Sequence, residues 1–107
     1  MIEQVYNFQE TDRKTIERIV DDQNVNLNHV VLGRNESLPD HFSNSHVYLI
    51  IVRGGLAVKL GDQEVKMYPS GTILSIPYDT KMAIKNEKKE PLEFFIVKAP
   101  PPEKKNA

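Results

Sequence analysis

The amino-acid sequence predicts a closed all-β barrel or sandwich of about eight to ten short strands in a single domain. The chain has 107 residues, which is enough for one hydrophobic core and too few for a second. Short apolar or alternating segments recur along it, and clusters of Gly, Pro, Asn and Asp separate them. This spacing of turns is typical of an all-β fold and argues against alternating strands and helices.

The segment from Asn35 to Gly54 is the centre of this prediction. It opens with turn residues, passes two of the three histidines and continues from His46 to Val52 as a nearly unbroken series of β-branched, aromatic and leucine side chains. The series stops at the pair Gly54-Gly55. Such a series is typical of a strand that is buried on both faces.

Three segments precede this central strand. Val5–Phe8 has the composition of a short edge strand. In Lys14–Asp22 the apolar residues fall at helical spacing, but the segment also leads into a turn as a strand would, so both structures remain open. In Val25–Leu32 apolar and polar residues alternate, which predicts a strand that becomes apolar on both faces at its end.

A hairpin and two further strands follow the central strand. Leu56–Leu60 and Gln63–Met67 alternate on either side of Gly61-Asp62, and a glycine at the first central position suits a type II′ turn. Thr72–Ile76 and Leu92–Val97 are apolar and bounded by turn residues, so we predict a strand in each.

Residues 35–54 resemble the first motif of the cupin family, whose members are small β-barrels and whose motif reads G-x5-H-x-H-x3-E-x6-G. Asn35 stands at the first glycine, His41 at the first histidine and Gly54 at the last glycine. Asparagine tolerates the left-handed backbone conformation better than other residues with a side chain, which explains how Asn35 can replace a glycine.

The second cupin motif, G-x5-P-x-G-x2-H-x3-N, is matched only in part. The tripeptide Pro69–Gly71 matches its P-x-G and Asn86 its final asparagine, whereas Met82 stands where many members have its histidine. In the first motif, Ser43 and Val47 replace the second histidine and the glutamate. The resemblance therefore implies a cupin barrel with degenerate metal-binding motifs.

The resemblance also implies how the chain is organised. It implies a cupin-like, or jelly-roll, barrel and favours a strand over a helix in Lys14–Asp22. We expect residues 1–24 to provide N-terminal strands that flank the barrel and residues 25–99 to form the barrel itself. Residues 100–107, with three consecutive prolines and then charged residues, are expected to be a disordered tail rich in Pro and Lys.

The candidate binding residues lie at the predicted barrel mouth. If His41 points inward, Ser43 follows it on the same face, while His46 faces outward. The expected mouth residues are His41, Ser43, Met82 and Tyr78. We expect no metal there, because one imidazole, one hydroxyl and one thioether form a weak site for a divalent ion. A shifted metal site would have to use His41 with His46, whereas we expect His29 to pair with a backbone group or water.

Three functions are compatible with these residues. The first is binding of a small molecule without a catalytic metal. The second is a metal-dependent enzyme of the dioxygenase or isomerase type, as many cupins are, with a divalent transition metal held by a shifted ligand set. The third is a structural or partner-binding dimer, whose barrel would be filled by its own side chains.

Composition limits the possible partners. Lys and Arg number 14 and Asp and Glu number 15, so a net charge of -1 provides no long-range field toward nucleic acid or an anionic membrane. The absence of cysteine excludes disulfides and thiolate ligands. We see no secretory signal, and the longest apolar run is too short to span a bilayer. We expect a soluble cytoplasmic protein that binds neither nucleic acid nor membrane.

A homodimer is expected from the central strand. Tyr48, Ile50 and Val52 lie on one face of this strand, and the barrel interior can take only the opposite face. Either the N-terminal segment or a second subunit must then cover these three side chains. Similar small cupins commonly dimerise through such a sheet.

We expect the purified protein to carry no stoichiometric transition metal. The combined substitutions Ser43→His, Val47→Glu and Met82→His should create a metal site with His41, and reverting any one of them should weaken that site markedly. Elemental analysis of the natural and the substituted protein measures both expectations. One iron, manganese or zinc ion per natural chain would contradict the first.

Overall fold

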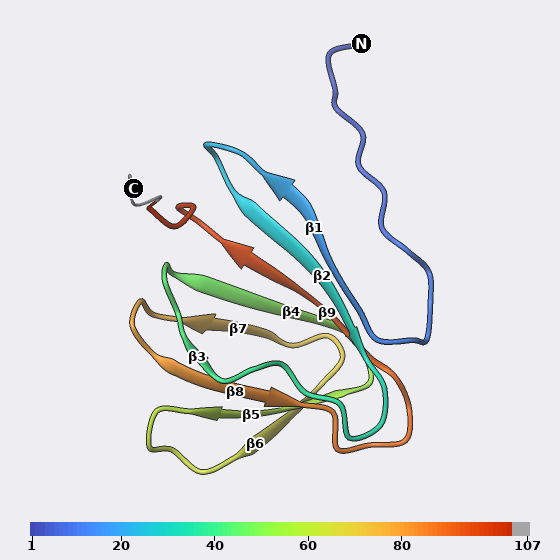
Figure 1. The fold of residues 1–107 in the computed structure, drawn as a ribbon, viewed down its shortest axis with the longest axis vertical. Helices are drawn as coiled ribbons and strands as arrows, with labels where there is room; N and C mark the ends of the chain where they lie inside the picture. Colours follow the sequence, from blue (N-terminus) through green and yellow to red (C-terminus); the bar gives the residue numbers. More distant parts are fainter. Residues whose placement is uncertain (104–107) are drawn as a thin grey trace.

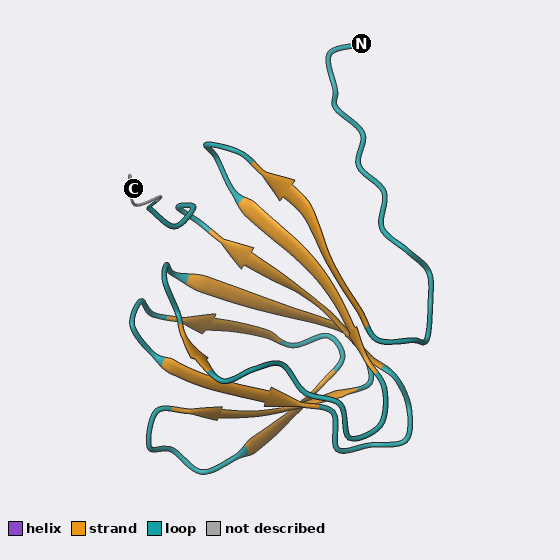
Figure 2. Cartoon of the chain, viewed as in Figure 1, coloured by secondary structure: helices purple, strands orange, loops and turns teal. Residues whose placement is uncertain are grey.

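The computed structural model describes residues 1–103, and this part of the chain forms nine β-strands in two sheets (Figures 1 and 2). The all-β fold and the expected number of strands are thus confirmed. Within residues 1–103 there is no helix long and apolar enough to cross a membrane. The strands are β1 (Thr15–Asp21), β2 (Asn26–Leu32), β3 (His41–Phe42), β4 (Val47–Arg53), β5 (Gly55–Leu60), β6 (Lys66–Pro69), β7 (Ile73–Ile76), β8 (Lys81–Lys85) and β9 (Leu92–Lys98).

All neighbouring strands are antiparallel. The larger sheet has the order β1-β2-β9-β4-β7 and the smaller sheet the order β3-β8-β5-β6. The last strand, β9, lies in the middle of the larger sheet, between β2 and β4 (Figure 1). From β2 onward the chain changes sheet after every strand except between β5 and β6, as in a jelly roll.

The two sheets enclose one apolar core. Side chains from the inner faces of both sheets fill it, and the largest of them, such as Phe94, Leu49 and Ile84, are almost completely inaccessible to solvent. Close packing of this kind leaves little room inside the barrel. The buried cluster consists of Val30, Leu32, Leu38, Val47, Leu49, Ile51, Leu56, Val58, Ile76, Met82, Ile84, Leu92, Phe94 and Ile96.

Strand β4 is buried on one face only. Val47, Leu49 and Ile51 point into the core, as the predicted alternation requires. Tyr48 and Val52 on the opposite face are exposed, with 37% and 45% of their surface accessible. The prediction of burial on both faces was wrong, because within residues 1–103 no second layer covers this part of the larger sheet.

The segment before β2 contains one strand rather than two. The predicted strand in Lys14–Asp22 is confirmed as β1, which pairs with β2 along its length. The predicted edge strand at Val5–Phe8 was wrong, since these residues make no ladder with a neighbouring strand and have no regular structure. We call residues 1–12 the N-terminal arm. Figure 1 shows that this arm leaves the body of the molecule and ends away from both sheets.

The hairpin between β5 and β6 has the predicted turn but a longer loop. Gly61 has a φ of 55°, and the Gln63 amide donates to the Leu60 carbonyl at 3.0 Å, as a tight turn requires. Pairing between the strands, however, begins at Val58 and Lys66. The predicted start of the second strand at Gln63 was therefore wrong, because the last two residues of β5 pair only with β8.

Two residues of the cupin motif have the backbone conformation expected of them. Asn35 has a φ of 64°, which confirms that it replaces a glycine in the left-handed region. Gly54 has a φ of 80°, and a Cβ atom there would lie 2.4 Å from the Pro91 carbonyl oxygen. Both residues turn the chain at the end of the barrel that lies opposite the β3–β4 and β7–β8 loops.

The side chain of Asn86 hydrogen-bonds three backbone groups at the same end of the barrel. It is fully buried, and its side-chain nitrogen donates to the carbonyls of Leu32 at 3.0 Å and Glu90 at 2.8 Å. Its side-chain oxygen accepts from the Lys88 amide at 2.9 Å. Because all of these partners are backbone groups, the final asparagine of the second motif stabilises the barrel here and is unavailable for a ligand.

Candidate functional site

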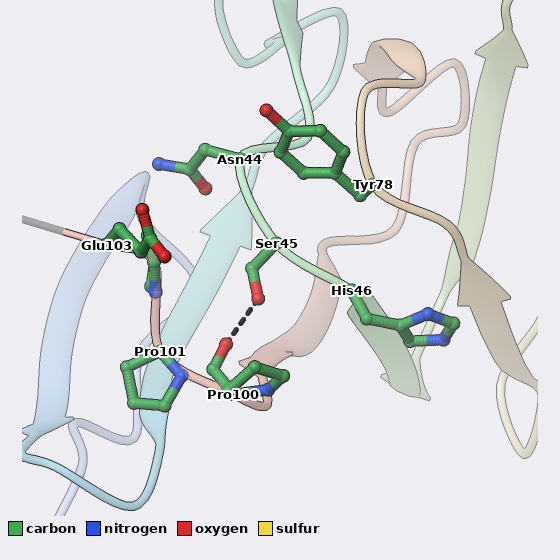
Figure 3. Close-up of a pocket in the computed structure, with 8 residues that line it drawn as sticks. Asn44, Ser45, His46, Tyr78, Pro100, Pro101 and Glu103 are labelled. Atoms are coloured by element: carbon green, nitrogen blue, oxygen red, sulfur yellow. Dashed lines mark hydrogen bonds between the residues drawn. The ribbon is translucent and has the colours of Figure 1, made fainter.

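A pocket of about 570 Å³ opens at one rim of the barrel, and we call it the rim pocket (Figure 3). Three segments meet there: the loop between β3 and β4, the loop between β7 and β8, and the chain that follows β9. Loops presented by a rigid sheet scaffold are common positions for binding residues. The lining residues are Asn44, Ser45, His46, Tyr78, Pro100, Pro101, Pro102 and Glu103.

The C-terminal segment forms one wall of this pocket. The Ser45 hydroxyl donates to the Pro100 carbonyl oxygen, and the Ala99 amide donates to the His46 carbonyl oxygen at 3.3 Å (Figure 3). We expected residues 100–107 to be a disordered tail. The structure instead places Pro100 to Glu103 against the loop before β4, and residues 104–107 lie outside the described part of the chain.

Ser43 holds the opposite wall in place. Its buried hydroxyl donates to the Pro77 carbonyl oxygen at 2.7 Å and accepts from the Thr80 amide at 2.8 Å. Its own backbone also bonds to Thr80 and to Asp79. The hydroxyl is therefore saturated by the loop that carries Tyr78, and its role is to position this loop rather than to contact a ligand.

Three of the four predicted mouth residues do not line the rim pocket, although His41 and Met82 are paired across β3 and β8. Met82 belongs to the core, and His41 is solvent-exposed with Nδ1 3.0 Å from the Pro39 carbonyl oxygen. The Ser43 hydroxyl already bonds to Pro77 and Thr80. Of the four, only Tyr78 lines the rim pocket, where 70% of its surface is accessible.

His46 was predicted to face outward, as an exposed or interface residue rather than a replacement metal ligand. It lines the rim pocket, but its Nε2 lies 2.7 Å from the Ser75 hydroxyl and its ring packs against Tyr48 at 4.8 Å between ring centroids. Figure 3 shows its ring pointing away from Glu103. The register places it on the outer face of β4, as alternation predicted.

The residues at the cupin metal positions do not suit a divalent ion. Val47 and Met82 are apolar and buried in the core, and the Ser43 oxygen already has two hydrogen-bond partners. His41 would be the one remaining nitrogen ligand. Among residues 1–103, no group of three or more His, Cys, Asp or Glu side chains is placed to hold a metal.

The described lining of the rim pocket combines an aromatic ring with a carboxylate. Within residues 1–103 no lysine or arginine lines the pocket, and Glu103, which Lys104 and Lys105 follow in the sequence, supplies the carboxylate. Tyr78 presents an accessible aromatic ring, and in the view of Figure 3 the Asn44 side chain lies between this ring and Glu103. An aromatic face with a nearby carboxylate attracts an organic cation.

Comparison with known proteins identifies relatives over nearly the whole chain. No family model matches the sequence. An uncharacterized protein of Methanocaldococcus jannaschii is 46% identical over 108 residues, which cover 100% of this chain and 93% of that protein. The crystal structure of an RmlC-like cupin family protein with a double-stranded β-helix fold, from the same organism, has a TM-score of 0.91 and 46% identity, covering 94% of this chain and 93% of that one.

More distant solved structures share the fold alone. An RmlC-like cupin protein from Desulfovibrio desulfuricans has a TM-score of 0.77 at 18% identity, covering 92% of this chain and 98% of that one. A cupin superfamily protein from Desulfitobacterium hafniense has a TM-score of 0.73 at 11% identity, covering 87% of this chain and 83% of that one. At these identities the barrel is retained while most side chains differ.

The substitution Ser43→Ala should lower the free energy of unfolding by about 1–3 kcal/mol, because it leaves the Thr80 amide and the Pro77 carbonyl without their partner. Urea denaturation measures this difference. The matched control is Ser70→Ala at an exposed position, which should change the value by less than about 0.5 kcal/mol. Equal effects of the two substitutions would contradict the positioning role of Ser43.

Proposed function

Because this chain belongs to the RmlC-like cupin family, we propose that it is a cupin that works without a catalytic metal and binds a small organic cation in the rim pocket. The observation that carries the proposal is the pairing of an exposed aromatic ring with a carboxylate in the lining that residues 1–103 give this pocket. A volume of about 570 Å³ is within the range of small-molecule sites.

The filled core supports binding at the rim rather than inside the barrel. A cupin that binds a metal and a substrate needs open space around the inward-facing ligands. Here the positions of Val47 and Met82 are occupied by side chains with 0% and 1% of their surface accessible. A ligand would therefore have to displace closely packed core residues to enter, which costs several kcal/mol.

In this proposal each wall of the rim pocket has one role. The ring of Tyr78 packs against the ligand's charged or apolar part, and Glu103 compensates the positive charge. Asn44 offers both a donor and an acceptor of hydrogen bonds. Because Ser45 binds the Pro100 carbonyl, a ligand held between the two walls would also stabilise the docked position of the C-terminal segment.

Benzylammonium and benzoate, which share an aromatic body and differ in charge, test the ligand chemistry. Benzylammonium should shift the NMR signals of Asn44 and Tyr78 with an affinity in the millimolar range that is expected of a fragment, whereas benzoate should not. A chelator should leave this binding unchanged. Equal binding of the two probes would contradict the cation preference, and loss of binding on chelation would favour the metal-dependent alternative.

The substitutions Tyr78→Ala and Glu103→Gln should each weaken benzylammonium binding about three- to tenfold. The matched control is Glu64→Gln, an exposed carboxylate in the loop between β5 and β6. It should leave the affinity unchanged, because it removes the same charge outside the pocket. If all three variants lost affinity equally, the effect would come from net charge rather than from the rim pocket.

A second candidate function is partner binding as a homodimer, and the outer face of the larger sheet supports it. Tyr48, Val52 and Ile73 lie exposed on this face, Ile73 with 64% of its surface accessible. The N-terminal arm of the same chain carries exposed apolar side chains, including Val5 and Tyr6. Two copies related by a two-fold axis could each cover the exposed face of the other, so we propose a second copy as the partner.

The substitution Ile73→Glu should shift the protein toward the monomer in sedimentation equilibrium at micromolar concentration, because it places a charge in the proposed interface. Val65→Glu is the matched control, since Val65 is comparably exposed but lies in the loop between β5 and β6. A natural protein that is already monomeric at this concentration would contradict the proposal.

A further inference from the structure

His29 lies buried between two carboxylates on the larger sheet. Its Nδ1 is 2.7 Å from Glu17 Oε2 and its Nε2 is 2.6 Å from Glu93 Oε2, while none of its surface is accessible. The rings of Phe8 and Phe95 enclose it, with centroids 4.7 and 5.1 Å from its own. We had expected this histidine to pair with a backbone group or water, and the structure shows carboxylate partners instead.

Strand register brings these groups together. His29 on β2 lies directly opposite Glu17 on β1 and Phe95 on β9. Glu93 is two residues before Phe95 and so projects from the same face of the sheet. This face is the outer one, because Val30, the next residue after His29, points into the core. Three strands that are far apart in the sequence therefore supply the cluster.

The distances fit an imidazolium at His29. A neutral imidazole has one N–H and can donate to one carboxylate, whereas both ring nitrogens here lie within short hydrogen-bond distance of a carboxylate oxygen. A proton on either glutamate would be the alternative. The Gln9 amide donates to Glu17 at 3.1 Å, and Arg53 Nε lies 3.2 Å from Glu93 Oε1. Both contacts favour ionised carboxylates.

The same cluster holds the base of the N-terminal arm. Glu17 accepts from the Gln9 amide, and the Arg53 guanidinium donates to the Thr11 carbonyl oxygen at 2.8 Å and to the Asp12 carboxylate at 2.5 Å. A bulge in β4 before Arg53 places this residue opposite Glu93. Each arm contact is thus made by a group that also contacts His29 or one of its two carboxylates.

We propose that Glu17, His29, Glu93 and Arg53 form a proton-dependent latch that holds residues 8–12 of the arm on the larger sheet and loosens when His29 loses its proton. The charged groups that face the latch are Glu17 on β1, Glu93 on β9, Arg53 on β4 and Asp12 in the arm. With His29 protonated, two positive groups oppose three negative ones. Without that proton one positive group remains, and one carboxylate faces a bare ring nitrogen.

The latch should hold the arm on the sheet only between two pH limits, the lower one set by Glu17 and the upper one by His29. Burial raises the pKa of Glu17, but the hydrogen bonds from Gln9 and His29 and the charge of His29 hold that pKa below its ordinary value. The contribution of Glu17 is therefore present above the ordinary range of a carboxyl group and is lost as the pH falls through the lowered pKa. The contribution of the imidazolium is present at low pH and is lost as the pH rises and the ring deprotonates.

Hydrogen exchange of the Gln9 amide reports the latch directly, since this amide donates to Glu17. Its protection factor, which is corrected for intrinsic exchange, should fall about tenfold over the pH range in which the His29 ring nitrogens titrate in ¹⁵N NMR spectra. The Phe8 and Arg53 side-chain signals should change over the same range. An unchanged protection factor through the titration of the ring would overturn the proposal.

The variant His29→Gln removes the titrating group. Its Gln9 amide should have a low protection factor at every pH, without the pH-dependent fall, or step, of the natural protein. The matched control is His46→Gln, which also removes a histidine from the outer side of the larger sheet but touches no latch residue. It should keep the full step. If His29→Gln does not fold, the titration of the natural protein still decides the question. A step that disappears in both variants would overturn the proposal.

Discussion

The burial of two inner sheet faces against each other is the constraint on which the rest of this structure depends. Alternate residues of β4 and β9 point into the same core as those of β5 and β8, and their apolar side chains fill the barrel. In a cupin that binds a metal, part of this interior carries imidazoles and a carboxylate. Here Val47 and Met82 stand in that place and pack in the core, and the candidate binding residues that we propose lie at the rim.

The outer face of the larger sheet has a different character. One half carries exposed apolar residues such as Tyr48 and Ile73, while the other half carries a buried ionic cluster around His29. A histidine between two carboxylates tolerates burial only if all of its hydrogen bonds are made. The N-terminal arm completes this condition, because Phe8 covers the ring and the Gln9 amide binds Glu17. Residues 8–12 at the base of the arm therefore belong to the folded structure even though they form no strand.

The fold was largely predictable, whereas the sites were not. Period-two alternation predicted which side chains of β4 enter the core, and the turn at Gly61 and the left-handed Asn35 followed from local chemistry. His41, Ser43 and Met82 were selected as mouth residues from their motif positions, and none of these three lines the rim pocket. The Ser43 hydroxyl is hydrogen-bonded to backbone groups of a loop more than 30 residues away in the chain. No sequence pattern predicts such a contact.

What the sequence determined by itself was local: most of the strands, their turns, and the inward and outward faces of β4. These properties depend on neighbouring residues and on backbone sterics. The tertiary structure alone decided which distant segments meet. It placed Pro100 against Ser45 and His29 between Glu17 and Glu93, because strand order and register set these neighbours. Since β9 inserts between β2 and β4, Glu93 contacts a buried histidine that lies 64 residues earlier in the chain.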